Sequence, residues 1–96
     1  MSELQLEERI EVKIPKKVKV IMHNDDYTTM DFVIEILTNV FNKDQKGAEE
    51  ITLKIHLEGE SVVGVYTRDI AFSKVRIANR LIELSGFPLK ITTEEE

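Results

Sequence analysis

The sequence predicts an α+β fold in which helices pack on one face of a three-stranded antiparallel sheet. From residue 18 onward, apolar and polar residues alternate, as they do in a strand with one buried face. Three later segments carry apolar residues at intervals of three and four, which is the spacing of helices buried on one side. Two short apolar runs, one after each of the last two helical segments, complete the order β-α-α-β-α-β.

The first predicted strand starts at Val18 and has Val18, Val20 and Met22 on its apolar face. The polar run 24–29 ends this strand, because Asn, Asp and Thr side chains bind nearby backbone groups in loops. Thr28 or Thr29 is expected to cap the helix that follows, since a hydroxyl oxygen accepts a hydrogen bond from the first turn. The buried stripe of that helix is predicted to be Met30, Val33, Leu37, Val40 and Phe41.

The second helix starts after a turn at residues 42–45 and ends near Gly59, a residue suited to the left-handed conformation. Residues 62–67 predict a buried strand, in which Gly64 indicates close packing. The third helix opens at residue 68 and ends at Gly86, and residues 89–93 form the last strand. The predicted buried residues of these two helices are Ala48, Ile51, Thr52, Ile55, Ala71, Val75, Ala78 and Ile82.

The composition is that of one small domain, and we expect no cofactor. Its 96 residues are 42% hydrophobic, enough for one compact core. The net charge of −5 argues against a nucleic-acid-binding protein, which usually has a basic face, and favours attraction of cationic groups. The absence of cysteine excludes disulfides and thiolate metal sites and makes the cytoplasm the expected compartment. No apolar run approaches the roughly 18 residues of a membrane span, so no membrane partner is expected.

We expect the chain to have three parts. Residues 1–16 form a flexible arm, residues 17–93 form a single domain, and residues 94–96 form a frayed acidic tail. Within the arm, the alternation of Ile10, Val12 and Ile14 also allows an additional edge strand.

Polar side chains cluster at the end of the first predicted strand, where Asn24, Asp25 and Asp26 follow one another. On the cluster alone, a capped turn without further function is the favoured interpretation, because these residue types are common in turns. His56 lies beside the apolar stripe of the second helix, where a lone histidine is usually a boundary residue. His23 points outward from its strand and receives no role.

Enzyme chemistry finds little support in these residues. The two histidines and two aspartates lack the fixed spacing of a metal site, so no metal is expected. Adjacent carboxylates such as Asp25 and Asp26 point apart and are poorly placed to share a proton. The sequence also contains no nucleophile elbow, phosphate-binding loop or dinucleotide fingerprint. A binding protein is therefore favoured over an enzyme.

Four stretches of the chain resemble one family closely: KVKVIMHNDDYTTMDFV at 17–33, ITLKIH at 51–56, GVYTRDIAFSK at 64–74 and FPL at 87–89. Together they resemble ClpS, the adaptor of bacterial and plastid Clp proteases, over residues 17–91. The resemblance implies a small α+β domain without catalytic activity. It implies binding of N-degrons, substrates whose first residue is Leu, Phe, Tyr or Trp, and their delivery to a ClpA or ClpC ATPase coupled to the ClpP peptidase.

The resemblance implies that Asn24, Asp26 and His56 bind the free α-amine of a substrate, with Asp25 a weaker candidate. Such an amine has a pKa of about 8 and is mostly a cation with three donors at neutral pH. The neutral His56 ring and the Asn24 carbonyl can accept, and Asp26 supplies charge. The implied pocket for the first side chain consists of Met22, Thr28, Met30, Val33, Thr52, Ile55 and Leu89. Taken without the resemblance, these residues read as core.

Thr52 departs from the family pattern, in which many members carry Met. The shorter side chain predicts either a roomier mouth that tolerates bulky or branched first residues or weaker binding of Leu.

A second implied surface contacts the N-terminal domain of the ATPase through Tyr27, Asp69 and Lys74, where Asp69 replaces the usual Glu. The arm resembles the family's flexible extension, and a monomer is expected. Two other interpretations stay open. One is a plain interaction module similar to the C-terminal domain of the ribosomal stalk protein. The other is a metal-dependent or acid–base enzyme that uses His56 with Asp25 or Asp26.

Overall fold

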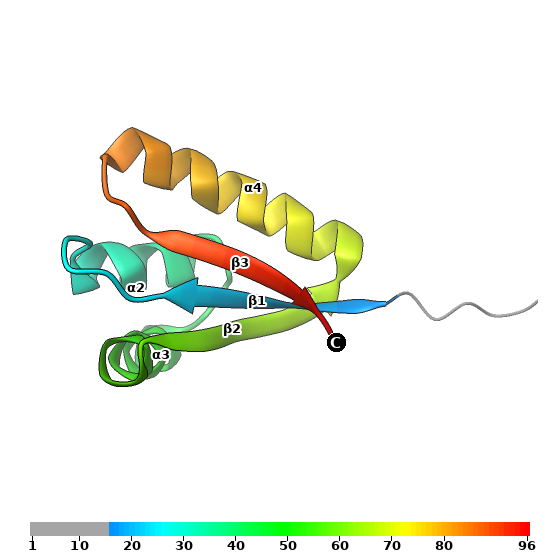
Figure 1. The fold of residues 1–96 in the computed structure, drawn as a ribbon, viewed down its shortest axis with the longest axis horizontal. Coiled ribbons are helices and arrows are strands. Elements are labelled where there is room, and N and C mark those ends of the chain that lie inside the picture. Colours follow the sequence, from blue (N-terminus) through cyan, green and yellow to red (C-terminus); the bar gives the residue numbers. More distant parts are fainter. Residues whose placement is uncertain (1–15) are drawn as a thin grey trace, which may run out of the picture.

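The structure, a computed structural model, describes residues 16–96. It confirms the predicted fold class and the order of the elements, β-α-α-β-α-β (Figure 1). The predicted arm falls almost wholly on residues 1–15, which lie outside the described part. The elements are β1 (Lys17–His23), α2 (Met30–Asn39), α3 (Gln45–Glu58), β2 (Glu60–Thr67), α4 (Arg68–Ser85) and β3 (Lys90–Glu95).

The sheet has β1 at its centre, in the antiparallel order β2-β1-β3. The prediction of a buried strand at residues 62–67 was wrong in part, because β2 is an edge strand. Val62 and Val65 point to the open face and are exposed, whereas Ser61 and Val63 are buried. Close packing at Gly64 is confirmed, since a Cβ there would lie 2.6 Å from the Tyr66 hydroxyl.

The C-terminal strand is longer than expected. Glu94 and Glu95 pair with Lys19 and Val18 of β1, so the predicted frayed tail at 94–96 is wrong for these two residues. Glu95 also forms an ion pair with Arg68, and the backbone N–H of Glu96 donates to the Lys17 carbonyl. Pairing with the central strand, rather than local propensity, therefore extends β3.

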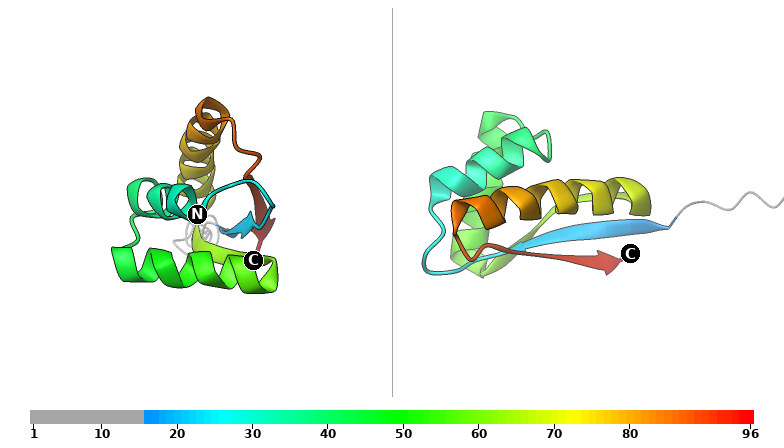
Figure 2. Two further views of the ribbon diagram at one scale, coloured as in Figure 1. Left: turned by 90° about the vertical axis from the view of Figure 1, so that its left-hand side faces the viewer. Right: turned by 90° about the horizontal axis from the view of Figure 1, so that it is seen from above.

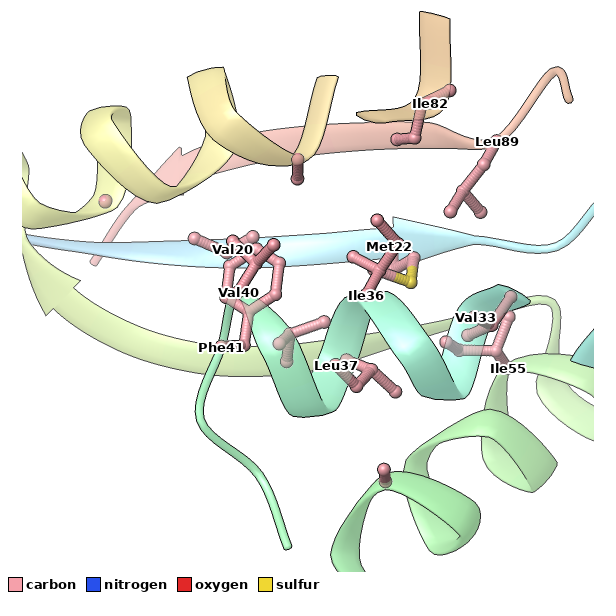
Figure 3. Close-up of a cluster of buried hydrophobic side chains, with 14 of the residues drawn as sticks. Val20, Met22, Val33, Ile36, Leu37, Val40, Phe41, Ile55, Ile82 and Leu89 are labelled. Atoms are coloured by element: carbon pink, nitrogen blue, oxygen red, sulfur yellow. The ribbon is translucent and has the colours of Figure 1, made fainter. Parts of the chain in front are cut away.

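The three helices gather on one side of the sheet and enclose the core between them (Figure 2). The apolar face of β1 packs against the inner faces of α2 and α4, as the labelled side chains show (Figure 3). Ile36, which was not predicted, is 1% exposed and central to this core. Met30, predicted as the first member of the α2 stripe, is instead 46% exposed. The buried cluster consists of Val18, Val20, Met22, Val33, Ile36, Leu37, Val40, Phe41, Ala48, Ile55, Val63, Ala71, Ala78, Ile82 and Leu89.

Capping residues fix where the helices begin and end. Thr29 caps α2 by accepting from the Phe32 N–H at 3.2 Å, one of the two caps expected there. Asp44 caps α3 in the same way. Gly59 and Gly86 end α3 and α4 with φ values of 91° and 81°, the left-handed conformation predicted for Gly59.

None of the helices in residues 16–96 is long and apolar enough to cross a membrane.

Candidate functional site

A cavity of about 270 Å³ lies where the loop after β1 meets the start of α2 and the last turns of α3. Residues from all three segments line it: Asn24, Asp25, Asp26, Thr28, Met30, Val33, Thr52, Ile55 and His56. The set divides into a polar part from the loop and His56, and an apolar part from the two helices. A cavity of this size suits one side chain rather than a larger ligand, because sites for drug-sized molecules usually exceed about 300 Å³.

The apolar wall comes from one face of each helix. Met30 and Val33 are three residues apart on α2, and Thr52 and Ile55 are three apart on α3, so each pair lies on one helical face. Figure 3 shows Val33 and Ile55 close together where the two helices meet. Val33 and Ile55 are buried, whereas Met30 is exposed at the rim.

The two threonines of the cavity have their hydroxyl groups occupied. The Thr52 hydroxyl donates to the Ala48 carbonyl at 2.7 Å, within α3. The Thr28 hydroxyl donates to Asp25 Oδ2 at 2.7 Å. Neither hydroxyl hydrogen is therefore available to a ligand, and the helical wall is apolar in effect.

The polar part contains three side chains that stay unbonded. Within residues 16–96, no hydrogen bond or ion pair involves the side chains of Asn24, Asp26 or His56. The backbone N–H of Asn24 donates to the Gly59 carbonyl at 2.8 Å. This bond ties the loop to the end of α3 and brings Asn24 to the same cavity as His56, which lies three residues before Gly59.

Asp25 is in a different environment from its two neighbours. Its Oδ1 accepts from the backbone N–H groups of Tyr27, at 2.8 Å, and Thr28, at 2.7 Å, while Oδ2 accepts from the Thr28 hydroxyl. Partial burial opposes the charge on Asp25, but the bonds from Thr28 and Tyr27 outweigh it and lower the pKa of Asp25 below its ordinary value.

Not every predicted pocket residue reaches the cavity. Met22 is 0% exposed and Leu89 is buried, and neither lines the cavity. Met22 projects from the central strand under α2, and Leu89 precedes β3 on the same side, so both lie in the core behind the wall (Figure 3). The other five predicted pocket residues line the cavity: Thr28, Met30, Val33, Thr52 and Ile55.

The three residues implied in ATPase contact do not form one cluster. Tyr27 is 76% exposed and follows the His23 end of β1. Asp69 is exposed in the first turn of α4, two residues after Thr67, which pairs with Lys17 at the opposite end of β1. Lys74 is half-buried, and its ammonium donates to the Val40 carbonyl and to Asn42 Oδ1. These residues therefore span the length of the central strand.

The second histidine lies on the open face of the sheet, outside the cavity. His23 Nε2 is 2.7 Å from Thr92 Oγ1, and Nδ1 is 3.5 Å from Glu60 Oε1. In the part of the chain that the structure describes, no group of three or more His, Cys, Asp or Glu residues is arranged to hold a metal ion.

Comparison with known proteins identifies the family. The family model described as ATP-dependent Clp protease adaptor protein ClpS matches residues 13–92. The ClpS adapter protein of Clostridium acetobutylicum is 48% identical over 90 residues, which are 94% of this chain and 89% of that protein. The ClpS adapter protein of Acetivibrio thermocellus is 49% identical over 90 residues, covering 94% of this chain and 91% of that protein.

A solved structure has the same fold. Agrobacterium tumefaciens ClpS2, determined bound to L-phenylalaninamide, matches with a TM-score of 0.82 and 41% identity. The match covers 86% of this chain and all of that chain. With the family model and these relatives in agreement over most of its length, the chain belongs to the ClpS family of adaptor proteins of the ATP-dependent Clp protease, which are not enzymes.

Proposed function

We propose that the cavity binds the free N-terminal α-amine and the bulky hydrophobic first residue of substrate proteins, and that the chain delivers them to a Clp ATPase. The observation that carries this proposal is the division of the cavity. The unbonded side chains of Asn24, Asp26 and His56 line the same cavity as the apolar residues Met30, Val33 and Ile55 of α2 and α3. A first residue has the matching division, with a cationic amine next to an apolar side chain.

The polar side suits an ammonium group better than an internal peptide nitrogen. A terminal amine has three donors and a positive charge, whereas an internal amide nitrogen has one donor and no charge. The Asn24 carbonyl and one nitrogen of a neutral His56 ring accept hydrogen bonds, and the Asp26 carboxylate supplies the opposite charge. A terminal amine can therefore use all three groups, whereas an internal amide cannot.

The apolar side suits Leu, Phe, Tyr or Trp. Burying one such side chain contributes about 1.5–3 kcal/mol, and each charge-assisted hydrogen bond contributes about as much. Association costs about 4 kcal/mol or more, so a dissociation constant of micromolar order is expected. The phenylalaninamide bound to the relative from A. tumefaciens has a free α-amine and an aromatic side chain, the two groups that the divided cavity would hold.

The proposal is tested by titrating a fluorescent peptide that begins with free Phe, beside its N-acetylated twin. Acetylation removes the charge and two of the three donors while the side chain stays in place. The acetylated peptide is expected to bind at least about a hundredfold more weakly, since two charge-assisted bonds are lost. Equal binding of the two peptides would mean that the polar cluster is a structural turn.

Matched variants assign the effect to the cavity. Asn24→Ala and His56→Ala are each expected to weaken binding about tenfold or more. Asn79→Ala and His23→Ala replace the same residue types outside the cavity, and their affinity should stay within about twofold of the wild type. If peptides with Leu, Phe, Tyr and Trp at the first position all fail to bind, the proposal is wrong.

Delivery would use a second surface toward the N-terminal domain of ClpA or ClpC. Exposed Tyr27 and Asp69 support such a contact, and half-buried Lys74 would add to it from α4. Because these residues lie at both ends of β1, the ATPase domain would have to contact the adaptor along its length. Tyr27→Ala and Asp69→Ala should each weaken binding to the purified domain while the affinity for the peptide is retained.

We propose that the chain acts as a monomer in the cytoplasm. The absence of cysteine supports this compartment, because nothing in the sequence depends on disulfides. Sedimentation of the purified protein at micromolar concentration tests the oligomeric state.

A further inference from the structure

Two adjacent aspartates of the loop line the same cavity but differ in how many hydrogen bonds their side chains make. Asp26 makes no bond within residues 16–96, whereas Asp25 accepts three hydrogen bonds, all from its own loop. A carboxylate has about four acceptor positions on its two oxygens, so Asp25 has little capacity left for a ligand. The two residues are therefore chemically alike but not equally available.

The three bonds of Asp25 fold the loop back on itself. Accepting from the N–H groups of the residues two and three positions later is the geometry of an Asx turn. The loop is also held at both ends. The Asn24 N–H bonds to the Gly59 carbonyl, and Thr29 caps α2. Asp25 lies between these two bonds, and its own hydrogen bonds hold the middle of the loop.

The loop has few other constraints to set its shape. Asn24, Asp26 and Tyr27 are exposed, so packing contributes little to their positions. Without the Asx turn, the backbone at Asp26 would be free to rotate, and the Asp26 carboxylate would no longer be held toward the cavity. Thr28, which lines the cavity, is held by the same carboxylate through its N–H and its hydroxyl.

We propose that Asp25 is a positioning residue, which holds the loop so that Asn24 and Asp26 face the substrate amine, and that Asp25 does not itself contact this amine. This inference rests on the proposed function. It gives Asp25, which the resemblance makes only a weaker candidate for binding the amine, a role different from that of Asp26.

The test uses three variants of the full chain: Asp25→Asn, Asp25→Ala and Asp26→Asn. Asparagine at position 25 keeps an oxygen that accepts from the Tyr27 and Thr28 N–H groups, so it preserves the turn without the charge. Alanine removes the turn as well. At position 26, asparagine removes the charge with little change of shape. Thermal unfolding of each variant shows that it is folded before binding is compared.

The readout is the affinity for a peptide that begins with free Phe, measured from pH 7 to pH 10. The affinity of the wild type should fall as pH rises above the pKa of the free amine, about 8, because the uncharged amine binds less well. The size of this fall measures how strongly the site prefers the charged amine. A residue that only stabilises the fold would not change it.

Asp26→Asn is expected to weaken binding about tenfold at pH 7 and to reduce the loss of affinity between pH 7 and pH 10. Asp25→Asn should stay within about threefold of the wild type at pH 7 and keep the full fall. Asp25→Ala should bind about tenfold more weakly at pH 7 and also keep the fall, because Asp26 is present but poorly placed.

Two results would overturn the assignment while the proposed function stands. Flattening of the pH dependence by Asp25→Asn to the same degree as by Asp26→Asn would show that Asp25 contacts the amine. Unchanged affinity in Asp25→Ala would show that the turn is not needed. If the wild type instead binds the acetylated peptide as tightly as the free one, the proposed function fails, and the role of Asp25 fails with it.

Discussion

The ammonium group of Lys74 donates a hydrogen bond to the backbone carbonyl of Val40, with the nitrogen and oxygen 2.9 Å apart. Val40 is the C-cap of α2, so a side chain from α4 binds a carbonyl at the helix end, where cations are favoured. The same ammonium donates to Asn42 Oδ1 at 2.8 Å and lies 5.6 Å from the centre of the Tyr66 ring. Lys74 thereby links the third helix of the chain to the first.

Replacing Lys74 with Met keeps the aliphatic part of the side chain and removes these bonds. We expect the free energy of unfolding to fall by about 1 kcal/mol, less than for a fully buried charged donor because Lys74 is half-buried. Lys54→Met, at an exposed position on α3, is the matched control and should be neutral. Urea unfolding measures both. Equal stability of Lys74→Met and the wild type would contradict a structural role for this contact.

Thr52 should widen the interior of the cavity rather than its mouth, because its side chain is only 4% exposed. Thr52→Met would fill part of the space, and we expect peptides that begin with Trp to lose about tenfold more affinity than those that begin with Leu. Thr52→Val keeps the shape and removes only the hydroxyl bond to Ala48, so its selectivity should match the wild type. Peptides beginning with Leu, Ile and Trp report the selectivity. An unchanged order in Thr52→Met would exclude this role.

Tyr66 should ionise at higher pH than an ordinary tyrosine. Burial raises the pKa of its phenol above 10.0, because the charged form is poorly solvated there. The chain has two tyrosines, so in Tyr27→Phe the phenolate absorbance reports Tyr66 alone. We expect the absorbance at alkaline pH to rise with a midpoint above 10.0.

The sign of the associated stability change follows from the raised pKa. Unfolded chains lose the phenol proton near pH 10.0 while the folded chain keeps it, so stability is complete below that pH and decreases above it. Tyr66→Phe should reduce this alkaline loss of stability relative to Tyr27→Phe. A Tyr66 midpoint at or below 10.0 would contradict the effect of burial.

Local patterns predicted the parts of the fold that local rules decide. The alternation of Val18, Val20 and Met22 identified β1, and Gly59 marked the end of α3 through its backbone conformation. Glu94 and Glu95 could not be assigned to a strand in this way, because they are ordered by pairing with β1, which lies far away in the sequence. Strand order depends on such distant contacts, so the edge position of β2 was missed for the same reason.

The candidate site, like the fold, could be predicted only in part from the sequence. The resemblance brought Asn24, Asp26 and His56 to attention, and the structure places all three on one cavity. The resemblance could not distinguish Met22, which lies in the core, from Val33, which reaches the cavity, because both are apolar and buried. The difference between Asp25 and Asp26 depends on which way each side chain turns in the loop, and residue type does not encode it.

Gly59 and Gly86 offer a test of how the end of α3 shapes the site. Both end a helix with positive φ, and an added Cβ at either position would meet no atom within 4 Å. Alanine should therefore cost each position a similar amount of stability, about 1 kcal/mol, through the left-handed backbone alone. The positions differ in one respect: the Gly59 carbonyl accepts from the Asn24 N–H, and His56 lies one turn earlier.

We expect Gly59→Ala to weaken binding of a free-amine peptide about threefold or more, because backbone strain there moves Asn24 and His56 relative to each other. Gly86→Ala should leave the affinity unchanged despite the same loss of stability, since its helix end lies outside the cavity lining. Comparing the two variants at one temperature, well below both unfolding transitions, separates geometry from stability. Equal affinities would mean that the loop keeps its position without the exact backbone at Gly59, and that the Asx turn at Asp25 alone determines where Asn24 and Asp26 point.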